Sequence, residues 1–410
     1  MGQDKCRHCG AELNVSVVDL GMSPLCESYV PAERLDSMEP FFPLHVSVCE
    51  KCLLVQLNEY VSAHEIFTEY AYFSSFSTAW LKHAEDYVEM ISKRLSLGAK
   101  SFVVELASND GYLLQYFVKK GIPCLGIEPA ANVAEAARAK GVETQVVFFG
   151  RESAAELRAS RGAADLIIGN NVLAQVPDVN SFVAGVSVAL SETGTATFEF
   201  PHLMTLFDQN QFDTIYHEHF CYFSLLAAEN IFAAQGLTLF DVEELWTHGG
   251  SLRIYLRPAA DESRPVSERV HALRAREEAA GFRDMETYRR FEQQVRATKR
   301  KLLGVLIEAK SQGKKIVGYG APGKGNTLLN YCGIREDFLD FTVDRNPYKQ
   351  GKFLPGTHIP IHAPERLDEA RPDYILILPW NFKDEIMKQL AHTREWGAKF
   401  IVPIPEATVI

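Results

Sequence analysis

The middle of the chain alternates short aliphatic runs with amphipathic stretches of helical period. Residues 101–117 predict a buried strand, a turn and a helix, and residues 123–141 repeat that order. Further strands are expected at residues 164–170 and 193–201. Strands that alternate with helices predict a doubly wound parallel sheet, which binds its ligand at the carboxyl ends of the strands.

The same pattern returns near the C-terminus, after a long polar region. Residues 262–312 are rich in Arg, Glu, Gln and Ala, with Leu and Val at helical intervals, so we expect a helical connector with a solvated face. Residues 314–334, 338–356 and 372–386 then predict a second set of strands and helices. The predicted fold class is therefore α/β, with a central doubly wound domain and a Rossmann-like C-terminal unit.

The composition is typical of a soluble protein with several domains. Hydrophobic residues make up 47% of the chain and charged residues 23%, which excludes a disordered protein. With 53 acidic and 42 basic residues the formal net charge is −11, so no broad nucleic-acid surface is expected. No apolar run approaches the roughly 20 residues that span a bilayer, and the start lacks the apolar core of a secretory signal. We expect a cytoplasmic protein with no membrane contact and no obligate protein partner.

Four of the eight cysteines form two CxxC pairs, Cys6 with Cys9 and Cys49 with Cys52. Two intervening residues let both sulfurs face one tetrahedral metal ion, and four thiolates leave no position for water. The spacing therefore favours a structural zinc site in a small N-terminal domain. The alternatives are a redox pair or four unligated cysteines. A redox CxxC opens a helix after a strand, and these pairs lack that setting.

Polar residues gather where the central strands end. The first turn has the sequence ELASNDG, with Ala107 where a dinucleotide site would carry a glycine. S-adenosylmethionine has no phosphate, so its site tolerates a looser turn whose side chains hold the amino acid end. Glu128, at the end of the next strand, suits the two hydroxyls of a ribose. The candidate cofactor residues, which favour S-adenosylmethionine over NAD, are Glu105, Ala107, Asn109, Asp110, Gly111, Glu128, Asn170 and Asn171.

The densest cluster of chemically active residues is the segment FDTIYHEHFCYFS. Its HxH spacing is not the HExxH pattern of a metal-binding helix, and no third ligand is obvious, so proton transfer is favoured over metal binding. Histidine takes up a proton near neutral pH, and a neighbouring carboxylate can orient it. The alternative is a polar loop that packs by its aromatic rings. The candidate residues are Tyr216, His217, Glu218, His219 and Tyr222.

Two further segments carry polar groups whose role the pattern leaves open. The hydroxyl-rich patch YAYFSSFST precedes an amphipathic helix, and it either caps that helix or binds an anionic substrate at its start. The glycines of THGGSLR predict a hairpin turn between strands, and its polar side chains are candidates for lining a pocket. The candidate residues of these two segments are Tyr70, Tyr72, Ser74, Ser75, His248 and Arg253.

The C-terminal unit contains a dinucleotide fingerprint. The glycines of GYGAPG satisfy GxGxxG after a strand, and an aspartate follows 21 residues after the last of them. Two details weaken this interpretation, because Pro322 lies inside the loop and Lys324 supplies a cation where dinucleotide sites use backbone amides. Lys324 and Asn326 instead suit a phosphate-bearing ligand of another kind.

Taken in order, these motifs resemble those of the S-adenosylmethionine-dependent C-methyltransferases that act on nucleotide-linked keto-deoxysugars. The resemblance covers essentially the whole chain and rests on the CxxC pairs, YFSSFS, ELASNDG, TIYHEHFCYFS, HGGSLR, GYGAPGKGNTLLNYCGI and PWNFKDEI. It implies a zinc-binding domain, placed here at residues 1–65, and a methyltransferase domain at 66–260. The third domain, at 261–410, holds the helical connector and a Rossmann-like substrate-binding unit that binds no NAD. The implied cofactors are S-adenosylmethionine and structural Zn2+.

The resemblance also implies a substrate and a mechanism. The substrate is a nucleotide-diphosphate sugar (with thymidine diphosphate as the usual carrier), whose C4 ketone acidifies C3 so that a base can form the attacking enolate. That base corresponds to His219, with Tyr216 and Glu218 placed to hold the enolate oxygen or to orient the base. Gln175 stands where some members carry a histidine, so proton transfer shared by two histidines is in doubt. The expected substrate-binding residues are Tyr70, Tyr72, Ser74, Ser75, Gln175, Tyr222, His248, Arg253, Lys324, Asn326 and Asn381.

Three other functions compete with this one. An NAD-dependent nucleotide-sugar oxidoreductase or epimerase would use the GxGxxG unit. A zinc-knuckle adaptor would keep an inert methyltransferase domain, which the intact YHEH segment argues against. An O-methyltransferase would share the cofactor but would need no ketone-acidified carbon.

Overall fold

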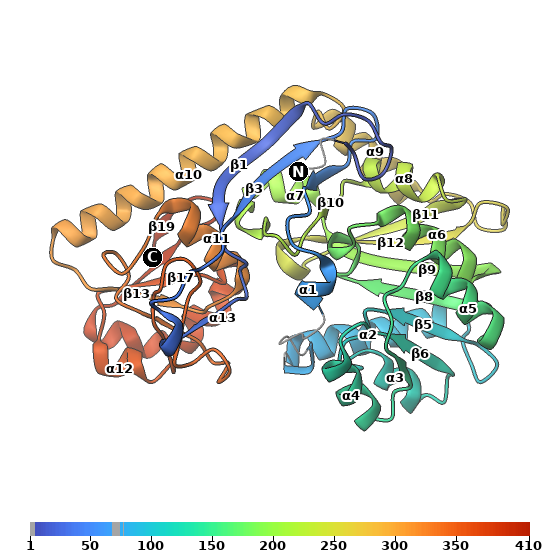
Figure 1. The fold of residues 1–410 in the computed structure, drawn as a ribbon, viewed down its shortest axis with the longest axis horizontal. Coiled ribbons are helices and arrows are strands. Elements are labelled where there is room, and N and C mark those ends of the chain that lie inside the picture. Colours follow the sequence, from blue (N-terminus) through green and yellow to red (C-terminus); the bar gives the residue numbers. More distant parts are fainter. Residues whose placement is uncertain (1–4, 68–73, 77) are drawn as a thin grey trace.

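The computed structural model describes residues 5–67, 74–76 and 78–410. Within them, a seven-stranded and a six-stranded sheet form the two large bodies of the molecule (Figure 1). Strands of a four-stranded sheet run between these bodies, beside the longest helix. Among the described helices, none combines the length and the apolar character that a membrane crossing requires.

The seven-stranded sheet has the order β11-β12-β9-β8-β5-β6-β7. Its strands are β5 (Val103–Leu106), β6 (Cys124–Ile127), β7 (Thr144–Gln145), β8 (Ala164–Asn170), β9 (Leu190–Pro201), β11 (Leu237–Leu245) and β12 (Ser251–Pro258). The first five in chain order pair in parallel, and β12 pairs antiparallel with both β9 and β11. The chain starts at β5, moves outward to β7 and then returns to β8 on the other side. This reversal opens a ligand crevice at the ends of β5 and β8.

Helices accompany this sheet as the hydrophobic pattern predicts. They are α2 (Thr78–Arg94), α3 (Leu114–Lys119), α4 (Ala131–Ala139), α5 (Arg151–Arg161), α6 (Val179–Ala189), α7 (Leu203–Asp208) and α8 (Leu225–Ala233). The buried positions of α2 are Ala84, Tyr87, Val88 and Ile91, which lie three or four residues apart and therefore on one face.

The N-terminal segment forms a four-stranded sheet with a strand from much later in the chain. Its order is β1-β3-β4-β10, with β1 (Val15–Ser23), β3 (Phe42–Val48), β4 (Val55–Leu57) and β10 (Cys221–Tyr222). The nine-residue β1 is not among the elements that the sequence pattern predicts. A short helix, α1 (Ala63–Phe67), follows, and β2 (Val30–Pro31) pairs with β15 (Lys352–Phe353) of the C-terminal unit. The N-terminal segment therefore contacts both large bodies.

The six-stranded sheet has the order β16-β14-β13-β17-β18-β19. Its strands are β13 (Ile316–Tyr319), β14 (Thr342–Val343), β16 (Ile361–His362), β17 (Tyr374–Ile377), β18 (Lys399–Val402) and β19 (Thr408–Val409). All pairs except β18 with β19 are parallel, and the accompanying helices are α11 (Gly323–Cys332), α12 (Arg366–Ala370) and α13 (Lys383–Gln389). This is the predicted Rossmann-like unit.

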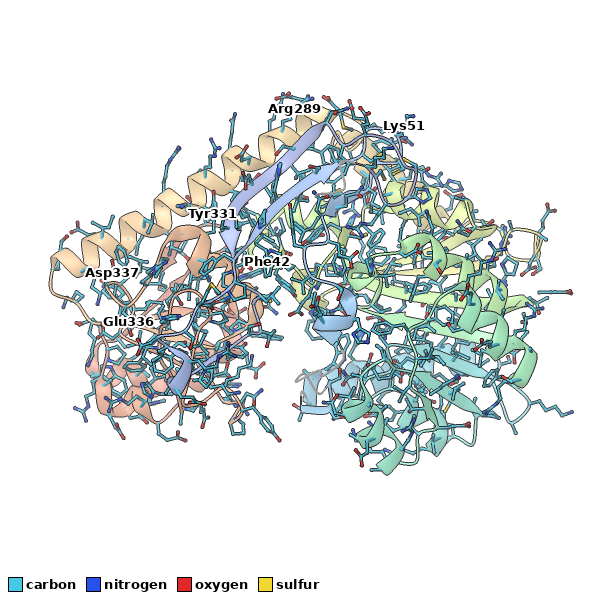
Figure 2. All side chains as sticks on the ribbon, in the orientation of Figure 1. Phe42, Lys51, Arg289, Tyr331, Glu336 and Asp337 are labelled. Carbon is cyan, nitrogen blue, oxygen red and sulfur yellow. The ribbon has the colours of Figure 1, made fainter. Side chains whose placement is uncertain are left out.

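The connector consists of α9 (Glu268–Ala279) and α10 (Met285–Ser311), as the helical spacing predicts. One face of α10 is buried at Tyr288, Phe291, Val295, Leu302 and Leu306. This face packs on β1, and α11 contacts β1 as well. Figure 2 shows side chains filling the angle between these elements, with Arg289 on α10 and Tyr331 on α11 labelled. The helix and the N-terminal sheet thus join the two large bodies.

Candidate active site and zinc site

The turn after β5 has the backbone that a close-fitting cofactor loop needs. Ala107, Asn109 and Gly111 all have positive φ, of 53°, 49° and 75°. At Gly111 an added Cβ would lie 3.0 Å from Cγ2 of Val142 and 3.2 Å from Cβ of Ala137. Glycine is therefore required both by its conformation and by close packing against α4 and the chain that follows it.

Glu128, at the end of β6, fixes this turn. Its Oε2 accepts a hydrogen bond from the backbone N–H of Asn109 at 2.9 Å, and its Oε1 accepts one from Ala130 N–H at 2.9 Å. A carboxylate offers about four acceptor sites, so two remain for the hydroxyls of a ribose. Burial raises the pKa of Glu128, while the two backbone N–H groups lower it.

Buried polar atoms without partners surround the same crevice. Both carboxylate oxygens of Glu105 and both carboxamide atoms of Asn170 are buried without a hydrogen bond of ordinary geometry within the described residues, and the Tyr112 hydroxyl is a neighbour of both side chains. Burial raises the pKa of Glu105. Buried polar groups are normally paired, so these atoms fit a polar ligand such as the amino acid end of S-adenosylmethionine.

The hydroxyl-rich patch contacts the cofactor turn. The backbone N–H of Ser74 donates to Oδ1 of Asn109 at 3.0 Å, and that of Ser75 donates to Oδ2 of Asp110 at 3.3 Å. Lys140 donates to the Ser75 hydroxyl at 2.6 Å and to Asp110 at 3.0 Å. Ser74 and Ser75 therefore lie over the cofactor turn. Two other predicted residues of the patch, Tyr70 and Tyr72, lie outside the described residues.

The YHEH segment sends its three acid–base side chains in different directions. Nε2 of His217 is 3.2 Å from the carbonyl oxygen of Pro43, on β3. The Glu218 carboxyl accepts from the Cys26 thiol at 3.7 Å, and burial together with the nearby Glu27 raises its pKa to about 8. The expectation that this carboxylate orients a histidine is therefore wrong for the structure described, because Glu218 faces the N-terminal segment.

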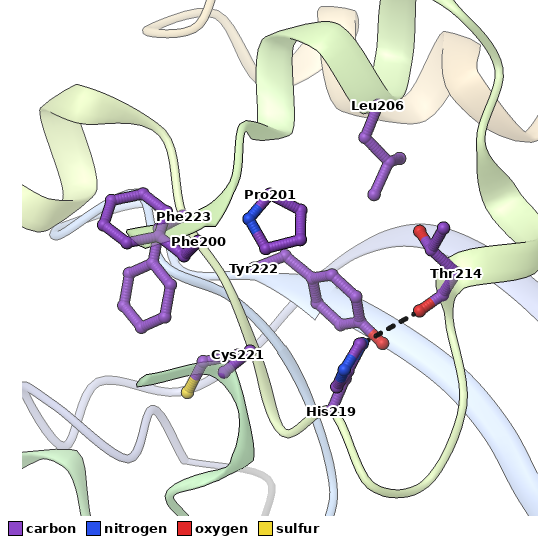
Figure 3. A pocket seen from close by; sticks show the side chains of 9 residues that line it. Phe200, Pro201, Leu206, Thr214, His219, Cys221, Tyr222 and Phe223 are labelled. Atoms are coloured by element: carbon purple, nitrogen blue, oxygen red, sulfur yellow. Dashed lines mark hydrogen bonds between the residues drawn. The ribbon is translucent and has the colours of Figure 1, made fainter. Parts of the chain in front are cut away.

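A main-chain carbonyl orients His219 instead. Its Nδ1 lies 3.1 Å from the carbonyl oxygen of Thr214, on the turn η4 (Phe212–Thr214), and Figure 3 shows this bond. Because the carbonyl can only accept, Nδ1 carries the hydrogen and Nε2 keeps its lone pair. Burial, together with the charges of His248 and Lys324, lowers the pKa of His219 to about 4. The imidazole is therefore neutral and able to accept a proton.

Two aromatic rings flank this imidazole. The Tyr216 ring is tilted by 34° against it with ring centroids 4.1 Å apart. The Tyr222 ring lies edge-on at 6.3 Å with its hydroxyl directed toward it (Figure 3). The cavity beside His219 and Tyr222, lined also by Ala174 and Leu206, measures about 10 Å³ and holds at most about one water molecule. This cavity is therefore too small to hold a sugar.

Lys324, near the start of α11, is a cation whose charge acts on His219. Its ammonium donates to Oδ1 of Asn381 at 3.0 Å and lies 4.7 Å from the ring centroid of Trp380. Trp380 Nε1 donates to Asp213 at 2.6 Å, and burial raises the pKa of Asp213 to about 6. Burial lowers the pKa of Lys324. The charge of Lys324 also lowers the pKa of His248 and of His219, so it acts on both imidazoles.

Other predicted pocket residues surround this cluster. His248 is exposed on η5 (Thr247–Gly249), and the Asn171 carboxamide donates to its Nε2 at 3.1 Å. Asn326 is buried on α11 with its Nδ2 unpaired within the described part of the chain. Gln175 is half-buried on η3 (Leu173–Gln175), in the segment whose Ala174 carbonyl bonds the YHEH segment.

Arg253 does not have a free guanidinium to offer to a pocket. Its Nε donates to Glu199 at 2.8 Å and its Nη1 to Glu243 at 2.9 Å, while Nη2 pairs with Glu199 at 2.6 Å. Glu199 also binds His83 at 2.8 Å, whose ring stacks on Trp80 beside His248. Arg253 therefore supports the pocket wall from behind rather than lining it.

The glycine-rich turn of the C-terminal unit is covered by the N-terminal segment. The Tyr29 hydroxyl and the Lys349 ammonium both donate to the Ala321 carbonyl, at 2.6 and 2.9 Å. A Cβ added to Gly323 would lie 2.8 Å from Sγ of Cys26. Asp344, the acid of the fingerprint, accepts from the Ala321 N–H at 2.7 Å. These glycines therefore serve packing within the protein, whatever their match to a dinucleotide motif.

The four paired cysteines fit a tetrahedral zinc ion. All four Sγ atoms of Cys6, Cys9, Cys49 and Cys52 lie within 4.8 Å of one another. Cys6 and Cys52 are 3.5 Å apart and Cys9 and Cys49 are 3.4 Å apart. Zn–S bonds of about 2.3 Å place tetrahedral sulfurs roughly 3.8 Å apart, close to these separations. With four sulfurs the shell is closed, as a structural site requires.

Comparisons with known proteins agree with this arrangement. Three families match in order: a zinc binding domain at residues 6–67, a methyltransferase domain at 80–242 and a C-methyltransferase C-terminal domain at 246–405. The chain is 38% identical, over 412 aligned residues, to the C-methyltransferase NovU of Streptomyces niveus, covering 99% of this chain and 97% of NovU. The chain belongs to the S-adenosylmethionine-dependent C-methyltransferases with an N-terminal zinc-binding domain.

Solved structures similar to this C-methyltransferase include two cofactor-dependent methyltransferases. One is an S-adenosylmethionine-dependent methyltransferase from Clostridium acetobutylicum, with 12% identity, a TM-score of 0.35, and coverage of 43% of this chain and 92% of that one. The other is magnesium protoporphyrin IX methyltransferase from Synechocystis with bound cofactor, at 12% identity, a TM-score of 0.33, and coverage of 43% and 80%.

The predicted enzyme class and both cofactors are confirmed for this C-methyltransferase. The NAD-dependent, adaptor and O-methyltransferase alternatives are therefore set aside. Sequence reasoning missed Thr214, Asp213 and Trp380, although all three lie inside or beside motifs it singled out. Their role depends on which atoms face His219 and Lys324, and residue type alone carries no signal of that.

Proposed function

We propose that this C-methyltransferase methylates C3 of a nucleotide-linked 4-keto-deoxysugar, with thymidine diphosphate as the carrier. The observation that carries the proposal is the orientation of His219. The Thr214 carbonyl binds Nδ1 of His219, which leaves the lone pair on Nε2. The charge of Lys324, a lysine that suits a phosphate, acts on the same imidazole. A neutral base next to an anion-binding cation is the arrangement that a carbon acid on a diphosphate carrier needs.

His219 is the general base of the proposed reaction. Its Nε2 removes the C3 proton, the C–H electron pair becomes the C3–C4 double bond of an enolate, and the negative charge moves to the C4 oxygen. Tyr216, whose ring lies against the imidazole, is the proposed donor to that oxygen. General-base catalysis typically contributes about 10²–10⁴-fold to the rate, so positioning and enolate stabilisation must supply the remainder.

The cofactor crevice lies at the ends of β5, β6 and β8. When bound there, S-adenosylmethionine supplies an electrophilic methyl group for the enolate carbon. Glu128 and the turn of Ala107 to Gly111 hold the cofactor, with Glu105 and Asn170 supplying the unpaired polar atoms. His219 afterwards releases its proton to solvent, which restores the neutral base.

Lys324 binds the diphosphate in this proposal. A diphosphate beside the ammonium would cancel the charge that lowers the pKa of His219. Substrate binding is therefore expected to make the base stronger when it is needed. Asn381 and His248 are the further proposed sugar or phosphate contacts, because both lie around Lys324.

The direct test is methyl transfer against a panel of nucleotide-linked 4-keto sugars, with deoxysugars lacking the ketone as controls. We expect transfer only to the keto sugars, and deuterium from heavy water at C3 when substrate and enzyme are incubated without methyl donor. Methylation of a hydroxyl, or no exchange with any keto sugar of the panel, would overturn the proposal.

His219→Asn tests the base directly. We expect a loss of about 10²–10⁴-fold in methyl transfer with unchanged affinity for S-adenosylmethionine, since the cofactor crevice lies elsewhere. His271→Asn, an exposed histidine on α9, is the matched control and should retain full activity. Full activity in His219→Asn would show that another group removes the proton.

A further inference from the structure

The first CxxC turn carries an arginine that reaches out of the zinc site. Arg7 stands between Cys6 and Cys9, in a tight turn closed by the Gly10 N–H to the Cys6 carbonyl at 2.9 Å. Its Nη1 donates to the Pro177 carbonyl at 2.7 Å, and its Nη2 donates to the Leu57 carbonyl. The guanidinium also lies 5.5 Å from the ring centroid of Phe220.

These three partners belong to the segments that hold His219. The Leu57 N–H donates to the Phe220 carbonyl at 3.0 Å, and the Phe220 N–H donates to the Ala174 carbonyl at 2.7 Å. Phe220 follows His219 directly in the chain, and Pro177 lies three residues after Ala174. Arg7 therefore caps a junction where β4, the YHEH segment and the loop of residues 171–178 meet.

Gln56 connects the cysteine cluster to the same junction. Its Nε2 donates to Sγ of Cys6 at 3.3 Å, and its Oε1 accepts from the Arg7 N–H at 2.9 Å. Its backbone stands opposite Cys221 in the pairing of β4 with β10. The Gln56 side chain therefore contacts the metal ligand Cys6, and the Gln56 main chain pairs with Cys221, which lies two positions after His219.

A second contact anchors the turn on α6. Asn180 Nδ2 donates to the His8 carbonyl at 2.8 Å, and Asn180 Oδ1 lies 2.8 Å from His8 Nδ1. Arg7 makes no ion pair among the described residues, and its guanidinium instead contacts two carbonyl oxygens and an aromatic ring. Such contacts depend on the planar fork of a guanidinium, which lysine cannot reproduce.

We propose that Arg7 is a positioning residue through which the zinc turn sets the placement of the catalytic base. The zinc site thereby acts on the reaction as well as on the fold. The inference rests on the proposed role of His219, and it extends that role by naming what holds the segment behind it. A shift of about 1 Å in a catalytic group can cost about 100-fold in rate, so a junction that holds His219 less firmly should lower kcat.

The test compares Arg7→Lys and Arg7→Gln with His45→Ala, an exposed change in the same N-terminal sheet. Zinc content and affinity for S-adenosylmethionine should stay at the wild-type level in all three. In both Arg7 variants we expect kcat to fall about 10–100-fold with KM changed less than about threefold. Backbone amides of residues 219–222 should exchange with heavy water faster, while His45→Ala matches the wild type.

Unchanged amide exchange at residues 219–222 in zinc-loaded Arg7→Lys would overturn the proposal. So would a rise in KM with kcat intact, because that would indicate a binding role. If Arg7→Gln loses zinc or unfolds, the smaller change to lysine decides. Amide exchange needs no substrate, so it separates this proposal from the proposed function, which fails instead if the wild type catalyses no exchange at C3 of a keto sugar.

Discussion

A single carbonyl determines what His219 can do. With Nδ1 held by Thr214, the imidazole has one tautomer, and the group that faces the substrate is an acceptor. Burial and the neighbouring cations keep it neutral, since they lower its pKa to about 4. The pKa of the neighbouring Glu218 is instead raised to about 8, so this carboxyl group keeps its proton at neutral pH, whereas His219 has lost its second proton. Two adjacent acid–base residues therefore have separate environments.

The pH profile should reveal this environment. Because the pKa of His219 is lowered, protonation of the base should reduce kcat/KM only as pH falls toward about 4, and not near 6.5. In the kcat profile the acidic limb should lie at higher pH, since a bound diphosphate offsets the charge of Lys324. Steady-state kinetics from pH 4 to 8 measure both. An inflection near pH 6.5 that persists in Asp213→Asn would contradict the expectation, because Asp213 itself titrates at about 6.

Glu128 offers a test of the cofactor site at the same scale. Replacing it with Gln keeps its size but sets an NH2 group against one of two backbone N–H donors. Hydrogen bonds to a charged group are worth about 1.5–3 kcal/mol, so the Kd of S-adenosylmethionine should rise roughly 10–100-fold by calorimetry. Glu143→Gln, an exposed partner of Arg161, is the control and should bind normally. Equal affinity in Glu128→Gln would exclude this contact.

At the level of elements, the first turn of α11 packs against the N-terminal segment and also carries Lys324. Its start is pinned by the N-terminal segment through Cys26 and Tyr29, while Lys324 extends toward Asn381 and Trp380. Lys324 is the cation of this turn, and its charge acts on His219. The anionic substrate must find its donors there, because the chain as a whole carries a net charge of −11.

Lys324→Met should therefore weaken substrate binding. Removing a charge-assisted contact to phosphate is expected to raise KM for the nucleotide sugar about 10–100-fold, with the affinity for S-adenosylmethionine unchanged. The effect should shrink as salt is added, because ions screen the wild-type attraction. Lys301→Met, on the exposed side of α10, controls for loss of a positive charge. A normal KM in Lys324→Met would move the diphosphate elsewhere.

For the whole molecule, the zinc site and the methyltransferase sheet are distinct in chemistry and joined in structure. Removing the metal with a chelator should release one zinc ion per chain and lower the melting temperature, since structural zinc contributes folding free energy. Cofactor binding should persist, because the turn after β5 contacts none of the four cysteines. Metal release measured with a colorimetric dye, followed by calorimetry, checks both points. Cys124→Ser, at a cysteine outside the cluster, should keep its zinc.

Sequence reasoning recovered those features that are local in the chain. The alternation of strands and helices, the turn at Ala107 to Gly111 and the CxxC pairs each lie within a few residues or recur at a fixed spacing. The contacts that hold the segments around His219 in place do not. Glu218 meets Cys26 from 192 positions away, and Arg7 meets Pro177 from 170 positions away. Such pairs depend on how whole domains pack, which residue type and spacing cannot encode.

The strand β10 has a consequence for how the chain is made. During synthesis the N-terminal residues leave the ribosome first, yet the sheet they begin is completed only when residues 221–222 emerge. Until then β4 is an unpaired edge, open to pairing with another nascent chain. A fragment that ends near residue 65 would keep that edge permanently exposed and should associate with itself, even when its four cysteines hold zinc.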